Sequence, residues 1–482
     1  MLHALSSLCR TPDEPFRLRA PSGMRRLPLA LAVAAALAAP AAWADEASLQ
    51  AEIADLRAQI AEMKAQMKEL AAQNKAAPPA TAAMAATAPA QPSSASTTAS
   101  STAPSTAPQQ AALAARVDRL EQSVAAHAET SSETGLFGYG EVTYNHPTHA
   151  ANQTQADLAR AVLGWTHRFD DRTRMAAEFE VEHAVSSSDD AGEAEIEQFY
   201  VERQFTHHVG GRAGLMLVPI GLTNEHHEPT QYYSVFRNLV ETAIIPTTWR
   251  EGGLAVYGGT ESGFHWNVGL TTGFNLAKWD ASSDEGRISP LGSIHQELQL
   301  AQARDLSQWL SVSYDGVPGW LLGGTVFTGK AAQGTTDFAA PNARITLWEA
   351  HARWQPGPFD LSALYSRGTI SDTEALNLTF IGQPTPVPKT FYGGYVQGAW
   401  RNAWTYQDYS LAPFTRYEWV NTAASYEAVP QGLGVDPTPT EQIWTVGADL
   451  YMSPNIVFKA DYQRYKDDSA RNSWQLGFGL NF

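Results

Sequence analysis

The stretch from Gly135 to Phe482 alternates apolar and polar residues with a period of two, and this pattern limits the folds open to the chain. Within residues 174–182, one face of an extended strand carries Met175, Ala177, Phe179 and Val181, and the other carries charged side chains. The last segment, 473–482, repeats the alternation and ends on an aromatic residue. Strands of ten to twelve residues with aromatic ends suit tilted strands that cross a lipid bilayer.

Sixteen such segments can be placed between residues 135 and 482, and an even number is expected of a closed membrane barrel. They are 136–144, 158–169, 172–185, 194–205, 209–218, 252–259, 263–274, 307–315, 320–328, 343–354, 358–367, 391–401, 413–422, 441–452, 455–466 and 473–482. Connections after even-numbered strands are short, apart from 402–412, and those after odd-numbered strands are mostly long. The spacing Leu291, Ile294, Leu298, Ala301 is helical, so we assign it to a long loop. The predicted fold is an all-β transmembrane barrel of about 16 antiparallel strands.

Composition excludes several other classes of protein. The net charge of −17 disfavours nucleic acid as a partner, because binding phosphates requires a basic surface. The single cysteine, Cys9, allows no disulfide framework within the chain. We find no G-x-S-x-G or other nucleophile signature, so we predict that the protein is not an enzyme and uses no cofactor.

The N-terminal 134 residues have a different composition and divide into four segments. Residues 1–44 are predicted to be a secretory signal peptide, with its charged start at Met24-Arg25-Arg26 and Met24 as a possible true start. Apolar residues then repeat every three or four positions in 45–75, which predicts a coiled coil in the periplasm. An Ala/Pro/Ser/Thr linker, 76–110, precedes a second short helix at 111–134, and the barrel occupies 135–482.

The longest candidate functional segment is the loop 219–251, which is rich in ionisable and aromatic residues. A connection of more than 30 residues in a compact domain is usually functional. Sixteen strands leave a water-filled channel, so we expect this loop to narrow it. The predicted constriction residues are Asn224, Glu225, His226, His227, Glu228, Arg237, Glu241, Arg250 and Glu251. By strand phase, Arg212, Arg353 and Arg416 are predicted to lie on the lumen wall.

Two phrases of the barrel segment, residues 217–225 (LVPIGLTNE) and 316–324 (GVPGWLLGG), resemble those of outer-membrane porins of the phosphate-selective O and P type. A coiled coil ahead of such a barrel is also similar to trimeric porins for dicarboxylic acids. The resemblance implies a homotrimer in the outer membrane of a Gram-negative bacterium, in contact with its lipid. It also implies passive diffusion of small, charged solutes and recognition of Phe482 by the barrel-assembly machinery.

The charge of the barrel segment argues against phosphate as the solute. Residues 135–482 contain 22 basic and 38 acidic residues, a net charge of 22 − 38 = −16, with five lysines. Alternatives to a general porin therefore stay open. They are a substrate-specific channel for an anion, an organic acid or a metal chelate, and a coiled-coil tether of the envelope anchored by the barrel.

The run Glu225-His226-His227-Glu228 could in principle bind a transition metal, because imidazole and carboxylate are common ligands. Adjacent histidines in an extended loop point to opposite sides, so they rarely share one ion. We therefore predict no metal site. Lining of the constriction and hydrogen-bonded anchoring of the loop remain the two interpretations of this run.

Overall fold

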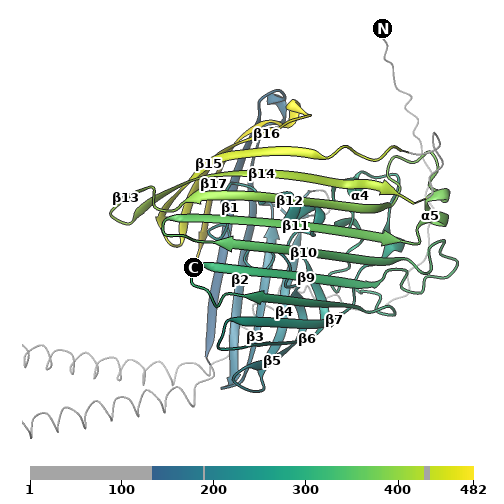
Figure 1. Ribbon diagram of the computed structural model, residues 1–482, viewed down its shortest axis with the longest axis horizontal. Helices are drawn as coiled ribbons and strands as arrows, with labels where there is room; N and C mark the ends of the chain where they lie inside the picture. The colour runs from purple at the N-terminus through teal and green to yellow at the C-terminus, as the bar shows by residue number, and fades with distance from the viewer. Residues whose placement is uncertain (1–132, 188–189, 428–434) are drawn as a thin grey trace, which may run out of the picture. The chain divides into compact units, whose positions relative to one another are not determined.

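The computed structural model describes residues 133–187, 190–427 and 435–482 (Figure 1). The predicted signal peptide, the coiled coil, the linker and nearly all of the second short helix lie outside the described residues. The strands are β1 (Thr134–Pro147), β2 (Gln155–Asp170), β3 (Thr173–Glu182), β4 (Ala194–Gln204), β5 (Val209–Leu217), β6 (Arg250–Gly259), β7 (Phe264–Thr271), β8 (Ser307–Tyr314), β9 (Trp320–Lys330), β10 (Arg344–Trp354), β11 (Phe359–Ser371), β12 (Pro388–Trp400), β13 (Trp404–Tyr406), β14 (Tyr409–Tyr426), β15 (Glu441–Ser453), β16 (Ile456–Tyr465) and β17 (Ser473–Asn481).

The strands form one antiparallel sheet that closes on itself. β1 pairs with β2 on one side and with β17 on the other, so that Tyr139 lies opposite both Val162 and Asn481. β12 pairs directly with β14, whereas β13 pairs with β14 alone and forms a short hairpin beyond the wall. Sixteen strands therefore make the wall, and this confirms the predicted barrel. The β13 hairpin is an addition that the alternation did not indicate.

The two rims of the barrel differ in the length of their connections. Residues 171–172, 205–208, 260–263, 315–319, 355–358 and 454–455 form tight turns on one rim, which also carries the start of β1 and the end of β17. Phe482 and Gly138 exchange backbone hydrogen bonds at this rim, with N···O distances of 2.9 and 3.1 Å. The connections at the opposite rim are longer, as the sequence predicts.

Short helical segments lie in the long loops. They are η1 (Ala151–Gln153), η2 (Val240–Ile244), η3 (Leu276–Lys278), α4 (Glu285–Ile288), η4 (Gly292–Ile294), α5 (Glu374–Thr379) and η5 (Ser469–Arg471). The segment from Leu291 to Ala301 lies in a loop rather than a strand, as expected, but only η4 within it is helical. Within the described residues, every helix is too short or too polar to cross a membrane.

Apolar side chains are presented on the outer face of the strands. Large exposed examples from the middle of strands include Leu163, Val201, Leu254, Val268, Leu310, Val326, Val396 and Val446. Exposed aromatic side chains concentrate where strands meet the short turns, and they include Phe169, Phe205, Trp320, Trp354, Phe359, Trp400 and Phe482. The rings of Trp320 and Trp354 stack with their centroids 5.1 Å apart.

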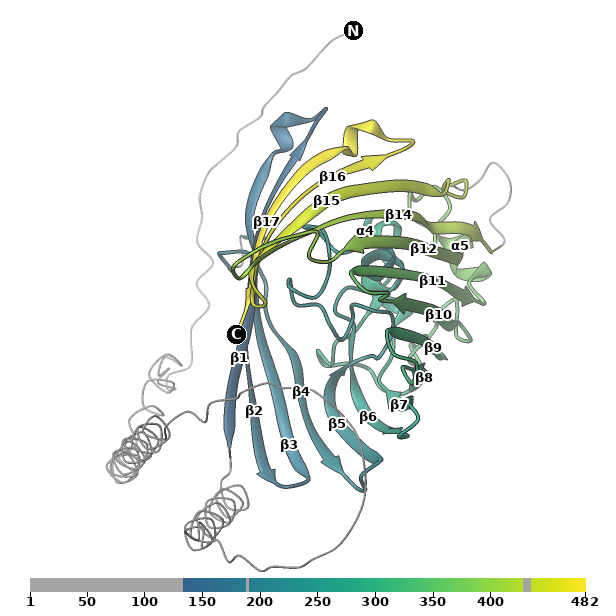
Figure 2. The same ribbon diagram turned by 60° about the vertical axis from the view of Figure 1, so that its left-hand side comes forward.

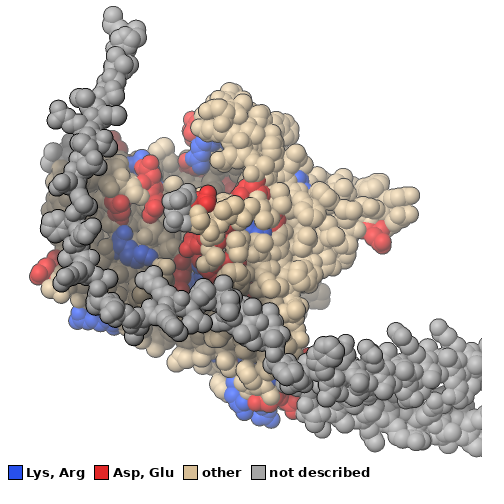
Figure 3. All heavy atoms as spheres, turned by 180° about the vertical axis from the view of Figure 1, so that it is seen from behind, with Lys and Arg blue, Asp and Glu red and all other residues tan. Residues whose placement is uncertain are grey.

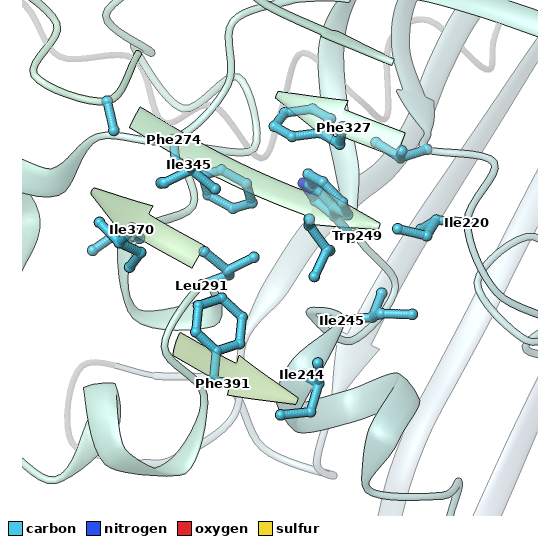
Figure 4. Close-up of a cluster of buried hydrophobic side chains, with 14 of the residues drawn as sticks. Ile220, Ile244, Ile245, Trp249, Phe274, Leu291, Phe327, Ile345, Ile370 and Phe391 are labelled. Carbon is cyan, nitrogen blue, oxygen red and sulfur yellow. The ribbon is translucent and has the colours of Figure 1, made fainter. Parts of the chain in front are cut away.

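Two loops fold into the barrel (Figure 2). The buried hydrophobic core lies between these loops and one part of the wall. The loop that connects β5 to β6 contributes Ile220, Ile244 and Trp249, and the loop from β7 to β8 contributes Phe274 and Leu291. Figure 4 shows these side chains packed against residues of β9 to β12 (Phe327, Ile345, Ile370 and Phe391). This cluster fills one side of the lumen and fixes the position of the β5–β6 loop.

Candidate functional site

The β5–β6 loop, residues 218–249, begins and ends side by side, and Asn224 joins its two ends; we call this junction the neck of the loop. The Asn224 amide nitrogen donates to the carbonyl oxygens of Val218 (2.8 Å) and Trp249 (2.9 Å). Its side-chain oxygen accepts from the Trp249 backbone nitrogen at 2.7 Å. The two ends of the loop are therefore held together by one buried side chain, which acts as an anchor at this position.

Two carboxylates of the predicted constriction set are also buried inside the loop structure. Glu241 accepts from the backbone nitrogens of Leu222 (2.6 Å) and Thr223 (2.8 Å) and from the hydroxyl of Tyr395 on β12 (3.0 Å). Glu251 accepts hydrogen bonds at the loop's exit, from Trp249 Nε1 (3.1 Å), Thr272 Oγ1 (2.7 Å) and the Gly273 nitrogen (2.9 Å). The structure thus places both side chains away from an aqueous gap.

Arg250 is buried as well. Its guanidinium pairs with Glu195 on β4 and, at 2.9 Å, with Glu297 of the β7–β8 loop. The predicted position of Arg250 at the lumen therefore differs from the observed one, because two carboxylates from separate elements draw the side chain into the packed region.

The far end of the loop, residues 232–235, is fixed to the opposite part of the wall. Lys459 on β16 donates to the carbonyl oxygens of Tyr232 (2.8 Å) and Ser234 (2.9 Å). Arg416 on β14 donates to Ser234 Oγ at 2.8 Å, and the Tyr233 hydroxyl donates to Asp360 at 3.2 Å.

Arg353 joins the same anchor, because it pairs with Asp360 at 2.6 Å. Arg416 and Arg353 therefore lie on the inner face of the wall, as their strand phase predicts. Both take part in holding the loop. Their role in selecting solutes stays a prediction.

Glu225 and His226 are the exposed members of the predicted set, and Glu225 lies beside a cavity of about 540 Å³. Arg212 also lines this cavity, where its guanidinium carbon lies 4.3 Å from the Tyr200 ring centroid and the side chain pairs with Glu202 at 2.9 Å. Enclosure by the barrel raises the pKa of Glu225 above its usual value, and attraction to Arg212 and His226 offsets part of this rise.

A second cavity, of about 630 Å³, lies on the other side of the loop. It is lined by Arg237 of the loop and by Arg160 of β2, among other residues. Arg237 donates to an uncharged group, Thr248 Oγ1, at 3.1 and 3.2 Å. Burial and then repulsion from Arg160 lower the pKa of Arg237.

The inner faces of β3 and β4 carry a row of carboxylates. The register between β3 and β4 shifts between Glu178 and Phe179, which leaves a β-bulge at Glu197. Because of this bulge, Glu195, Glu197, Tyr200 and Glu202 of β4 all face inward. We define the acidic wall as Glu178, Glu180, Glu182, Glu195, Glu197 and Glu202. Figure 3 shows acidic and basic side chains gathered in a hollowed part of the molecule, beside broad uncharged surfaces.

His227 and Glu228, the remaining members of the predicted set, face the acidic wall. His227 is 3% exposed, and its Nε2 lies 3.8 Å from Glu197 Oε1. Glu228 is half-buried and repels Glu178 electrostatically. Adjacent histidines 226 and 227 therefore differ in environment, one exposed and one buried, as expected for neighbours in an extended segment.

The prediction from sequence omitted Arg160, Lys459 and the acidic wall. Arg160 pairs with Glu141 at 2.8 Å and also donates to the carbonyl oxygen of His227. The alternation that identified β3 already placed Glu178 and Glu180 on the polar face, so the wall could have been inferred. The pairing of Arg160 and Lys459 with backbone oxygens of a loop carries no sequence signal.

Comparison with known proteins identifies one related sequence and a shared fold. No protein-family model matches the chain. An uncharacterized protein of Aquifex aeolicus is 29% identical over 346 residues, which cover 69% of this chain and 76% of that protein. A solved structure of Salmonella typhi OmpF in complex with daunomycin matches with a TM-score of 0.51 at 11% identity, over 73% of this chain and 98% of that one. The chain therefore shares the sixteen-strand barrel fold of an outer-membrane porin.

Proposed function

We propose that the chain forms a water-filled channel in the outer membrane of a Gram-negative bacterium, through which small, charged solutes diffuse passively. The observation that carries the proposal is the position of the β5–β6 loop, which lies inside a closed barrel with a cavity on each side of it. A loop held in this way narrows the lumen without blocking it.

The outer surface supports placement in a lipid bilayer. Side chains such as Leu254, which is 62% exposed, would be unfavourable in water but suit contact with lipid. The exposed aromatic residues beside the short turns correspond to an aromatic girdle at one interface, where rings with apolar bodies and polar edges are stabilised.

We further propose that the channel prefers cations to anions. Among the described residues, the unpaired cavity-lining carboxylates include Glu225 beside the first cavity and Glu182 beside the second. Arg160 and Arg212, which also line these cavities, are each paired with a carboxylate. Selectivity depends on charges close to the permeating ion rather than on net charge. Arg237 is the main positive charge on the loop that opposes this preference. Because we expect cations to be favoured, we do not expect a phosphate-selective channel.

Assembly as a homotrimer and insertion through the barrel-assembly machinery belong to the same proposal. Phe482 supports it, because its side chain is 68% exposed on the outer face at the short-turn rim, beside the β1–β17 seam. Deleting Phe482 should lower the amount of folded protein in the outer membrane. Normal levels at ordinary expression would contradict recognition of this residue.

The proposal is tested by reconstituting purified protein into planar bilayers. Stepwise conductance with a reversal potential in a salt gradient that indicates cation preference would support it. Envelope defects on deletion of residues 45–134, with unchanged conductance, would instead favour the tether.

A further inference from the structure

Glu178 on β3, Glu197 on β4 and His227 of the β5–β6 loop converge behind the loop. One candidate ligand atom from each residue lies within 4.8 Å of the others. The three residues are 7%, 1% and 3% exposed, respectively. Three elements therefore bring an imidazole and two carboxylates together in a site largely shielded from solvent.

The imidazole of His227 has a defined tautomer. Its Nδ1 lies 2.9 Å from the carbonyl oxygen of Asn224. A carbonyl oxygen only accepts hydrogen bonds, so Nδ1 must carry a hydrogen. In the neutral ring, the lone pair of Nε2 then faces the carboxylates of the acidic wall, which is the form of histidine that binds metals.

With a neutral His227, the hydrogen bonds between His227 Nε2, Tyr139 and Glu197 lack one hydrogen. Tyr139 has a single hydroxyl hydrogen, yet its oxygen lies 2.7 Å from His227 Nε2 and 2.8 Å from Glu197 Oε2, two acceptors. With His227 neutral, acceptors therefore outnumber the hydrogens available to them, and either a proton on Nε2 or a bound metal cation would balance the group.

We propose that Glu178, Glu197 and His227 bind one divalent transition-metal ion, with Zn²⁺ as the best match to the donor set. Zn²⁺ is commonly held by histidine nitrogen and carboxylate oxygen, and an imidazole ligand disfavours Ca²⁺ and Mg²⁺. Zinc–ligand distances of roughly 2.0–2.2 Å require the three side chains to draw together when the ion binds.

Each candidate ligand also has a partner that orients it. Gln198 Nε2 donates to Glu178 Oε2 at 2.6 Å, Tyr139 contacts Glu197, and the Asn224 carbonyl fixes His227. Such outer contacts are typical of metal sites, because they set the tautomer and direction of the ligands. The hydrogen bonds of the Asn224 side chain at the neck of the loop make this support rigid.

The site would couple the metal to the position of the loop. His227 belongs to the loop, whereas the two glutamates belong to the wall, so one ion would tie the loop to β3 and β4. This inference does not depend on the proposed channel, because binding is measured on folded protein in detergent without any conductance.

The test is isothermal titration calorimetry of purified, folded protein that has been stripped with EDTA and is titrated with ZnCl₂. Wild type is expected to bind one Zn²⁺ per chain at this site. His227→Ala and Glu197→Gln should each weaken binding at least tenfold. His226→Ala is the matched control, because it removes the exposed neighbouring imidazole and should leave zinc affinity unchanged. CaCl₂ and MgCl₂ should not compete at equal concentration.

Heat-modifiable migration on gels establishes that each variant is folded. If His227→Ala or Glu197→Gln fails to fold, Glu178→Gln and the visible absorption spectrum of Co²⁺-loaded wild type take their place. A tenfold loss with Glu178→Gln and an intense tetrahedral-type Co²⁺ spectrum would support the site. Absence of zinc binding by wild type, wild-type affinity in His227→Ala or Glu178→Gln, or loss in His226→Ala instead would overturn it and leave a proton-sharing cluster.

Discussion

Arg160 of β2 donates a hydrogen bond to the main-chain oxygen of His227, and its Nε pairs with Glu141 of β1 at 2.8 Å. A charged side chain of the wall thus holds the β5–β6 loop by its backbone, at the residue whose ring faces the acidic wall. The loop is fixed here, at its neck and at its far end. The channel would therefore have a lumen of defined width.

The neck residue Asn224 gives a first prediction. Asn224→Ala removes three buried hydrogen bonds and leaves two carbonyl groups and one backbone N–H without their partner. We expect a loss of about 1–3 kcal/mol in unfolding free energy, because buried polar groups without partners are costly. Denaturant unfolding in detergent measures the change. The exposed Thr247→Ala serves as control, and equal stability of the two variants would rule out the role of the neck.

Glu251 and Glu225 are two carboxylates of the same region, one buried and one exposed, and they test the effect of burial. Glu251→Gln disturbs three hydrogen bonds at a fully buried carboxylate, so it should lower the midpoint of thermal unfolding. Glu225→Gln changes an exposed carboxylate of the same loop and should leave that midpoint nearly unchanged. Comparable midpoints for both variants would show that burial does not distinguish the two carboxylates.

Much of the fold could be predicted from the sequence, because the apolar and polar alternation is visible within each strand. Alternation placed all sixteen wall strands, because lipid on one side and water or packed loops on the other impose a period of two. The short β13 hairpin escaped, since Trp404-Thr405-Tyr406 is too short to show a pattern.

The path of the loop was less accessible from sequence. Inward-facing glycines mark part of it: a Cβ at Gly479 would lie 2.4 Å from Pro229, and one at Gly477 would lie 3.1 Å from Val235. Glycine at these positions permits close approach of the loop to β17. Which loop comes this near depends on tertiary packing, so the glycines alone do not identify it.

The candidate site was likewise predicted only in part. Length and composition indicated the loop, yet Glu241, Arg250 and Glu251 proved to be buried anchors rather than exposed groups. Sequence spacing cannot separate these roles, because a carboxylate that binds backbone N–H groups and one that faces water look alike in one dimension.

Arg237 provides a prediction about selectivity. Arg237→Gln removes a positive charge that lies beside the larger cavity, so the reversal potential should shift toward cations. Since two charges about 4 Å apart interact by roughly 1 kcal/mol in water, we expect a two- to fivefold change in permeability ratio, as an order of magnitude. Arg237→Lys keeps the charge and should behave like wild type. A shift as large in Arg237→Lys would assign the effect to shape instead.

Glu225 predicts a dependence on pH. Because its pKa is raised, Glu225 loses its negative charge at a higher pH than an ordinary glutamate when the solution is acidified. Cation preference should therefore fall as pH is lowered from neutral into the mildly acidic range. Glu225→Gln should start from lower cation preference and show a smaller change over the same range. The difference between the two titrations isolates this residue from the nearby His207, His208 and Glu261. Parallel curves would argue against it.

The most direct test of the proposed channel is the reversal potential of single channels formed by the folded wild-type protein in a planar bilayer with a KCl gradient. We predict discrete conductance steps and a reversal potential on the side that indicates passage of K⁺ in preference to Cl⁻. Folded, heat-modifiable protein that inserts without conducting would contradict the channel. A reversal potential indicating Cl⁻ preference would contradict the assignment of the cavity-lining carboxylates Glu225 and Glu182 as the controlling charges.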